Sequence, residues 1–272
     1  MSDRVVVTRV PGGVADVRLN RADKMNALDT AMFEALVETG TELARDPSLR
    51  AVVLSGEGRC FSAGLDFSSF QSMSGGPRAE KPAANLLSRG DASSLANFAQ
   101  RAAWVWTEVP VPVIAAVHGV AYGGGLQIAL GADLRFVTPD AKLSVMEIKW
   151  GLVPDMSGTQ TLRRLVRLDV AKELTFTGRV VSGTEAVLLG LATRVAADPR
   201  AAALEIAAEI ATKSPDAIRA AKHLLDASGV VSVADGLRLE EKLQLGLIGR
   251  PNQIESVRAN LEKRAPRFQD PS

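Results

Sequence analysis

Apolar and polar side chains alternate near the start of the chain and predict two paired strands. In residues 14–20 (VADVRLN), apolar residues alternate with Asp16 and Arg18, which is the pattern of a strand with one buried face. Residues 11–13 read Pro-Gly-Gly, a turn signal. We therefore expect two strands within residues 4–20, joined by this turn.

Helical periodicity replaces the alternation after residue 29. Apolar residues recur every three or four positions over residues 30–45, which predicts an amphipathic helix. Asp29 or Thr30 can cap its start, and Asp46-Pro47 ends it. Residues 50–58 (RAVVLSGEG) then form an apolar run typical of a buried strand. This order of elements favours parallel pairing with a right-handed crossover.

A second strand-and-helix unit follows along the chain. Residues 95–108 have helical spacing, and residues 110–119 (PVPVIAAVHG) form another apolar strand. Three consecutive glycines then open a short helix, and residues 132–145 return to a strand pattern. Beyond Ser157 the pattern is mostly helical, and the predicted helices cover residues 158–168, 184–189, 199–212, 215–227, 233–248 and 253–263. The pattern predicts an α/β core followed by a helical C-terminal third.

One long segment fits neither strand nor helix. Residues 67–94 are rich in Ser, Gly, Pro and charged residues. A structureless loop of this length inside a compact domain is uncommon. Two interpretations stay open: a functional lid or mobile segment, and a disordered surface insertion.

Composition narrows the class of protein. The 272 residues, 46% of them hydrophobic, can bury a core as one large domain or two smaller ones. The net charge of +1, from 32 basic and 31 acidic residues, gives no reason to expect nucleic acid or a membrane surface as a partner. The single cysteine, Cys60, excludes an intramolecular disulfide. We expect it to be a buried apolar residue in a reducing cytoplasm. We find no signal peptide pattern and no apolar run of the ~18 residues that a membrane span needs.

Two glycine-containing turns directly follow predicted strands. They are CFSAGLD (residues 60–66) and YGGGLQ (residues 122–127). Ligands bind at the carboxyl ends of strands in α/β folds, and glycine lets backbone N–H groups approach a ligand. The second turn also opens a helix, whose N-terminus attracts negative charge. Two N–H groups aimed at one point would form an oxyanion hole; the alternative is two tight, closely packed turns.

Two carboxylates are candidates for proton transfer. Glu147 lies in an apolar context (SVMEIKW), and burial would raise its pKa into the range useful for acid–base work. Asp155 follows eight residues later, beyond Pro154, so the two must converge through a turn. The alternative for each is a surface or capping carboxylate, and Asp155 is placed to cap the helix that begins near residue 158.

Other catalytic candidates are few. The chain has two histidines, His118 and His223. We expect His118 to be hydrogen-bonded at the end of a strand rather than catalytic. No His, Cys and carboxylate cluster has metal-ligand spacing, so we expect no metal.

The motifs together resemble one family. They are LNRADKMNALD, GRCFSAGLDF, PVIAAVHGVAYGGGLQIALGADLRF, EIKWGLVPDMSGTQTLRRL, LTFTGRVVSGTEAVLLGLATRV and ESVRANLEKRAPRF. In this order and spacing they resemble the crotonase superfamily, the enoyl-CoA hydratases and isomerases. The resemblance implies an α/β spiral of repeated ββα units at residues 1–198, carrying the acyl-CoA site. It implies a helical region at residues 199–272 that mediates a homotrimer or a dimer of trimers. It also implies an acyl-CoA thioester substrate, with coenzyme A part of the substrate and no separate cofactor.

The resemblance also assigns roles to residues. The oxyanion N–H groups would belong to Leu65 and Gly124. The substrate-binding positions would be Lys24, Met25, Ala27, Ala63, Asp66, Gln127 and Lys263, the last approaching the CoA phosphates, often from a neighbouring subunit.

Position 127 separates the activities within the family. Typical hydratases hold a water between two glutamates. The second of these matches Glu147, and the first matches Gln127. The amide of a glutamine cannot exchange a proton at useful pH. Dienoyl-CoA isomerases carry an aspartate at the position of Asp155, and their additional aspartate, at the position of Gln127, is missing here. We therefore favour a double-bond isomerase with Glu147 and Asp155 as acid and base. The alternatives are a hydratase that uses Glu147 alone with Gln127 orienting the water, and an acyl-CoA-binding protein without catalysis.

Overall fold

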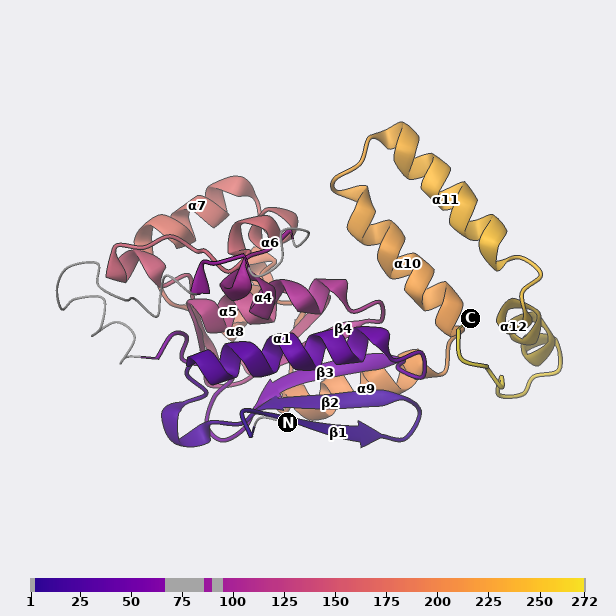
Figure 1. Cartoon of the computed structure of the whole chain (residues 1–272), viewed down its shortest axis with the longest axis horizontal. Helices are drawn as coiled ribbons and strands as arrows, with labels where there is room; N and C mark the ends of the chain where they lie inside the picture. The colour runs from indigo at the N-terminus through magenta and orange to yellow at the C-terminus, as the bar shows by residue number, and fades with distance from the viewer. Residues whose placement is uncertain (1–2, 67–85, 90–94, 272) are drawn as a thin grey trace.

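The computed structural model describes residues 3–66, 86–89 and 95–271 (Figure 1). Most of the predicted lid or insertion at residues 67–94 lies outside these ranges, so both interpretations of it stay untested. Within the described ranges, no helix has the combined length and apolar character that a membrane span would require.

The strands form a six-stranded sheet and a smaller three-stranded sheet. They are β1 (Val5–Val10), β2 (Val14–Leu19), β3 (Ala51–Gly56), β4 (Val113–Val117), β5 (Val120–Tyr122), β6 (Leu134–Val137), β7 (Lys142–Ser144), β8 (Val181–Ser182) and β9 (Arg194–Val195). The large sheet has the order β1-β2-β3-β4-β6-β9, and the small one β5-β7-β8. The predicted hairpin is confirmed as the antiparallel pair β1 and β2. The predicted parallel pairing across the first helix is confirmed by β2 and β3.

The helices connect these strands and extend beyond them. They are α1 (Thr30–Arg45), α4 (Phe98–Glu108), α5 (Gly124–Leu130), α6 (Gly158–Leu165), α7 (Leu168–Thr177), α8 (Gly183–Leu189), α9 (Pro199–Ala211), α10 (Pro215–Ser228), α11 (Val233–Leu247) and α12 (Pro251–Leu261), with short 3-10 turns η1 (Ala22–Lys24) and η2 (Glu147–Trp150). The order β1-β2-α1 recurs as β4-β5-α5 and as β6-β7-α6, as expected for repeated ββα units.

Side-chain capping fixes where two predicted helices begin. The α1 bounds match the prediction, because the Asp29 carboxylate accepts a hydrogen bond from the Met32 N–H at 2.9 Å. The helix expected from residue 95 begins at Phe98 instead. Asn97 and Gln100 form a reciprocal capping box there, which starts α4 three residues later.

Two predictions about elements are wrong in detail, and two short strands were not predicted. The single strand expected over residues 132–145 is two strands, β6 and β7, which belong to different sheets. The helix expected over residues 158–168 ends at Leu165, because Val166 has an extended backbone, and α7 follows as a separate helix. The two-residue strands β8 and β9 are too short to leave a periodic signal.

Helices cover both faces of the large sheet. One face packs against α1 and α4 in a core that contains Phe33 and Trp106. The other packs against α9, where Ala203 and Ala207 meet apolar side chains of the sheet. Because both faces are covered, all six residues of β3 are buried. Beyond α9, helix α10 contacts both α11 and α12, and the three helices project from the core (Figure 1). The domain division at residue 198 stays a prediction.

Candidate active site

The two glycine turns lie side by side, as the oxyanion-hole prediction requires. Backbone hydrogen bonds join them: the Ser62 N–H donates to Val120 O at 3.0 Å, and the Tyr122 N–H donates to Ser62 O at 3.1 Å. Gly64 of the first turn has a φ of +87°, and a Cβ there would lie 2.5 Å from Tyr122 O of the second turn. The close approach of the turns therefore depends on a residue without a side chain at position 64.

The predicted donors are free to bind a ligand. Leu65 is held by its neighbours, since Leu28 N–H donates to Gly64 O and Asp66 N–H donates to Leu28 O. Gly124 is the first residue of α5 and has no intrahelical acceptor for its N–H. Among the described residues, neither the Leu65 N–H nor the Gly124 N–H has a hydrogen-bond partner. Both residues line one cavity.

That cavity has a volume of about 960 Å³. Its walls include nine residues that the sequence identified: Lys24, Met25, Ala27, Ala63, Leu65, Asp66, Gly124, Glu147 and Asp155. They also include Tyr122 and Gly123 of the second glycine turn, and residues that the sequence reasoning missed: Arg21, Asp23, Phe33, Arg59, Leu86, Leu87, Ala99, Met146, Trp150, Leu152 and Met156. The cavity thus joins a set of charged residues to a largely apolar wall, which suits a ligand with an anionic part and an acyl chain.

Several of the missed residues lie in separate segments of the chain, and no sequence pattern indicates that these segments meet at the cavity. Arg21 lies just before η1, and its guanidinium donates to the Asp66 carboxylate and to Ala27 O. This ion pair fixes Asp66 at the cavity wall. Arg59 precedes the first glycine turn. Both arginines lie inside quoted motifs, LNRADKMNALD and GRCFSAGLDF, but arginines are too common at protein surfaces for this to select them.

Glu147 is buried beside the second glycine turn. It begins η2, three residues after β7 ends at Ser144, and is 8% exposed. A Cβ at Gly123 would lie 3.3 Å from Glu147 Oε1, so the carboxylate packs against the bare glycine. Burial raises the pKa of Glu147, and the negative charge of Asp155 raises it further. A buried carboxyl group with a raised pKa suits a residue that exchanges protons with a ligand.

Asp155 lines the same cavity from the turn before α6. Desolvation by the surrounding protein raises the pKa of its carboxyl group. The alternative that Asp155 caps α6 is wrong. The N-cap is Ser157, and the N–H of Gly158, the first residue of α6, donates to the side chain of Gln127 at 2.9 Å. Asp155 is therefore available to a ligand.

Gln127 is not among the residues that line the cavity, and its assignment as a substrate-binding residue stays a prediction. It is 2% exposed on α5. Its Nε2 donates to Glu147 Oε1 at 2.6 Å, and its Oε1 accepts hydrogen bonds from the N–H groups of Met156 and Gly158, both at 2.9 Å. Gln127 therefore reaches the cavity through Glu147.

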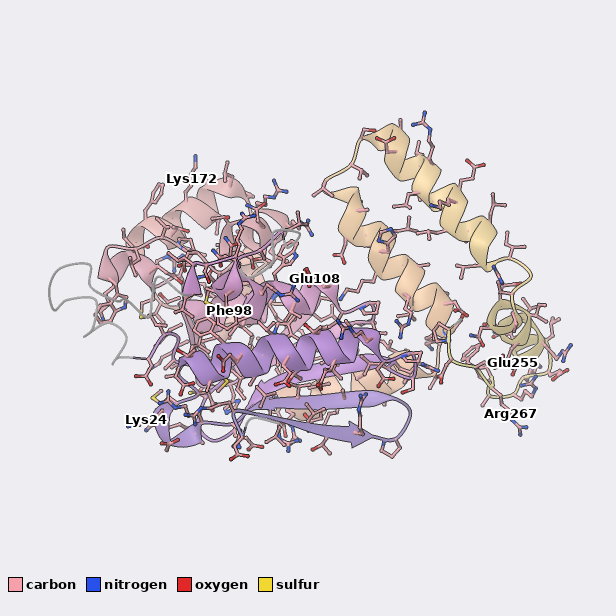
Figure 2. The ribbon with its side chains drawn as sticks, viewed as in Figure 1. Lys24, Phe98, Glu108, Lys172, Glu255 and Arg267 are labelled. Atoms are coloured by element: carbon pink, nitrogen blue, oxygen red, sulfur yellow. The ribbon has the colours of Figure 1, made fainter. Side chains whose placement is uncertain are left out.

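Lys263 lies apart from the cavity within one chain. It is exposed at the end of α12 and is not part of the cavity wall. Lys24 and the α12 region, marked by Glu255 and Arg267, lie at opposite ends of the molecule (Figure 2). A role for Lys263 at a neighbouring subunit's site stays a prediction.

The remaining predictions concern Cys60, His118 and a metal site. Cys60 is buried, and burial raises the pKa of its thiol, as expected for an inert residue. The His118 ring lies 2.9 Å from Gly58 O at the end of β4, which confirms the expected strand-end hydrogen bond. Within residues 3–66, 86–89 and 95–271, no group of three His, Cys, Asp or Glu side chains is placed to hold a metal ion.

Comparison with known proteins decides the family. A sequence model described as enoyl-CoA hydratase/isomerase matches residues 9–271. The chain belongs to the enoyl-CoA hydratase/isomerase family. The resemblance drawn from the motifs is therefore confirmed.

Relatives in this family have more than one activity in their names. A probable enoyl-CoA hydratase of Bacillus subtilis (strain 168) is 35% identical over 247 residues, covering 89% of this chain and 90% of its own. The mitochondrial Δ(3,5)-Δ(2,4)-dienoyl-CoA isomerase of Mus musculus is 34% identical over 266 residues, covering 96% of this chain and 80% of its own. The family alone leaves the reaction open between hydration and isomerisation.

Solved structures confirm the crotonase-like fold. The crystal structure of an enoyl-CoA hydratase from Bacillus anthracis superposes with a TM-score of 0.88 at 30% identity. The match covers 98% of this chain and 100% of that one. The predicted α/β fold with C-terminal helices is therefore confirmed.

Proposed function

We propose that this protein shifts double bonds in a 3,5-dienoyl-CoA thioester to give the 2,4-dienoyl isomer. Glu147 and Asp155 exchange protons with the acyl chain, and the N–H groups of Leu65 and Gly124 hold the thioester oxygen. One observation carries the proposal: both carboxylates line the same cavity as these N–H groups, and burial raises the pKa of each.

The reaction needs one base and one acid. One carboxylate takes the proton from C2, and the C–H electron pair enters the conjugated chain, with negative charge on the thioester oxygen. The other carboxyl group, protonated at the start, gives its proton to C6, and the double bonds come to rest at C2 and C4. Atoms and charges balance without a co-reactant. The raised pKa values favour a protonated partner, and each oxyanion donor contributes roughly 3 kcal/mol.

The test uses purified protein and a 3,5-dienoyl-CoA substrate. We expect Glu147→Gln and Asp155→Asn each to lower kcat by about 10²–10⁴. Glu38→Gln and Asp140→Asn make the same chemical changes at exposed positions and should leave kcat unchanged. Full turnover in both site variants would contradict the assignment.

Hydration of a 2-enoyl-CoA is the second candidate. It is favoured by the B. subtilis relative named a probable hydratase and by Glu147, whose Oε2 has no hydrogen-bond partner among the described residues. Gln127 lies behind Glu147, so Glu147 alone would activate the water. Crotonyl-CoA hydration faster than dienoyl-CoA isomerisation would favour this candidate. Tight acyl-CoA binding with no product from either substrate would favour a non-catalytic binding protein.

The C-terminal helices support a proposed homotrimer or dimer of trimers. Helix α11 has no buried residue in the single chain. Large apolar side chains lie exposed along α11 and α12, namely Val233, Leu237, Leu245, Ile254, Val257 and Leu261. An apolar surface of this kind is typical of a protein–protein contact.

We also propose a cytoplasmic location, supported by the lone buried cysteine. We propose further that catalysis needs no cofactor beyond the coenzyme A of the substrate.

A further inference from the structure

Gln127 is a buried polar residue whose hydrogen bonds connect the Glu147 carboxylate to the backbone that follows Asp155. Its amide orientation is fixed, because Oε1 accepts from two backbone N–H groups, those of Met156 and Gly158. An inverted amide would place N–H groups against N–H groups. The Nε2 group must therefore face Glu147, to which it donates at 2.6 Å.

This contact makes the two oxygens of Glu147 unequal. Oε1 faces an N–H donor, so it accepts a hydrogen bond whether Glu147 is ionised or protonated. A proton on Glu147 must therefore sit on Oε2, which is buried and has no partner among the described residues. A carboxylate with one oxygen occupied and one free is oriented before any substrate arrives.

The same side chain also fixes the turn that carries Asp155. Gln127 Oε1 holds the backbone on the C-terminal side of Asp155, at Met156 and Gly158. A Cβ at Gly158 would lie 2.5 Å from Gln127 Oε1, so glycine at this position is required for the contact. Gln127 thus joins the proton-transferring group on η2 to the turn before α6.

We propose that Gln127 is a positioning residue that makes Glu147 Oε2 the single proton-transferring oxygen and sets its placement relative to Asp155. This inference rests on the proposed function. A glutamate at position 127 would still accept the two backbone N–H groups. Its other oxygen would face Glu147 Oε1 within hydrogen-bond distance, and two carboxylates this close must share a proton.

The charged groups around Glu147 are the background against which the effect of Gln127→Glu on its titration is measured. Asp155 is the charged group that acts on Glu147 from the turn before α6, and Tyr122 lines the same cavity from β5. The other charged groups of the cavity wall are Arg21, Asp23, Lys24, Arg59 and Asp66. A new carboxylate at position 127 would place its charge directly against Glu147, where the Gln127 Nε2 lies 2.6 Å from Glu147 Oε1.

The first experiment compares the pH dependence of kcat/KM for dienoyl-CoA in wild type, Gln127→Glu and Gln160→Glu. Gln160 is exposed, so the Gln160→Glu substitution makes the same chemical change outside the site. We expect the acidic limb of the Gln127→Glu profile to move to higher pH by about one unit or more. The Gln160→Glu profile should match wild type. Superimposable profiles for all three proteins would overturn the inference while leaving the proposed function intact.

The second experiment needs no turnover. Infrared difference spectra across a pH series report the protonated-carboxyl band, and the part lost in Glu147→Gln belongs to Glu147. We expect this band to persist to higher pH in Gln127→Glu than in wild type, with unchanged far-ultraviolet circular dichroism. An unchanged midpoint would overturn the inference. A wild type without turnover but with the expected infrared shift would instead contradict the proposed function alone.

Discussion

The carbonyl oxygen of Tyr122 occupies the space in which a side chain at Gly64 would lie. A Cβ at position 64 would be 2.5 Å from that oxygen and 3.7 Å from the Gly124 nitrogen. The bare glycine therefore sets the distance between the turn that carries Leu65 and the turn that carries Gly124. Oxyanion stabilisation depends on the placement of both donors.

We expect Gly64→Ala to damage both stability and turnover. The positive φ alone costs roughly 1–2 kcal/mol for an L side chain, and the contact with Tyr122 O adds to it. Displaced donors should lower kcat by up to about 10²-fold. Gly229→Ala is the control, because Gly229 has a φ of −84° and open space around it. Urea unfolding and steady-state kinetics give the answer; equal stability in the two variants would contradict the packing argument.

The raised pKa of Glu147 links stability to pH. The folded state holds the proton of Glu147 to a higher pH than the unfolded chain, whose glutamate pKa is about 4.3. Between these two values the native state binds more protons, so its stability falls as pH rises. We expect the free energy of unfolding of wild type, relative to Glu147→Gln, to fall over this window and then level off. Urea unfolding at a series of pH values tests this, with Glu38→Gln as the control; a pH-independent difference would count against it.

Lys222 connects the projecting helix α10 to the core. Its Nζ lies 2.7 Å from Asp133 Oδ2 and 3.1 Å from Val111 O, and its side chain is 7% exposed. We expect Lys222→Met to lower the free energy of unfolding by about 2–3 kcal/mol, because Asp133 loses its ion-pair partner. Lys172, which points to solvent in Figure 2, is the control. Calorimetric unfolding that moves equally little in Lys222→Met and Lys172→Met would refute this role.

The exposed apolar residues of α11 predict self-association. We expect wild type to sediment as a trimer or a dimer of trimers, and Leu237→Glu with Leu245→Glu to shift it toward monomer. Burying a charge in a subunit contact costs several kcal/mol unless it is paired. Lys242→Glu changes an exposed charged position of the same helix and should leave the assembly intact. A monomeric wild type in analytical ultracentrifugation would contradict the proposed assembly.

Features that depend on neighbours along the chain were predictable from the sequence. The β1–β2 hairpin follows from alternation and a Pro-Gly-Gly turn, and the bounds of α1 follow from the Asp29 cap. The apolar run of β3 indicated a strand covered on both faces; α1 and α4 cover one face and α9 the other. The motif order identified the family, which the comparisons confirmed.

Features that depend on contacts between distant segments were decided by the tertiary structure. The sequence marked Gln127 as unusual, yet its engagement with Glu147 and with the turn at residues 156–158 appears only in the folded chain. In the same turn, the Gly158 N–H donates to Gln127, so the alternative in which Asp155 caps α6 is wrong. Periodicity and capping act over a few residues, so the sequence determines local elements. Which buried polar groups satisfy one another is settled when elements far apart in the chain pack together.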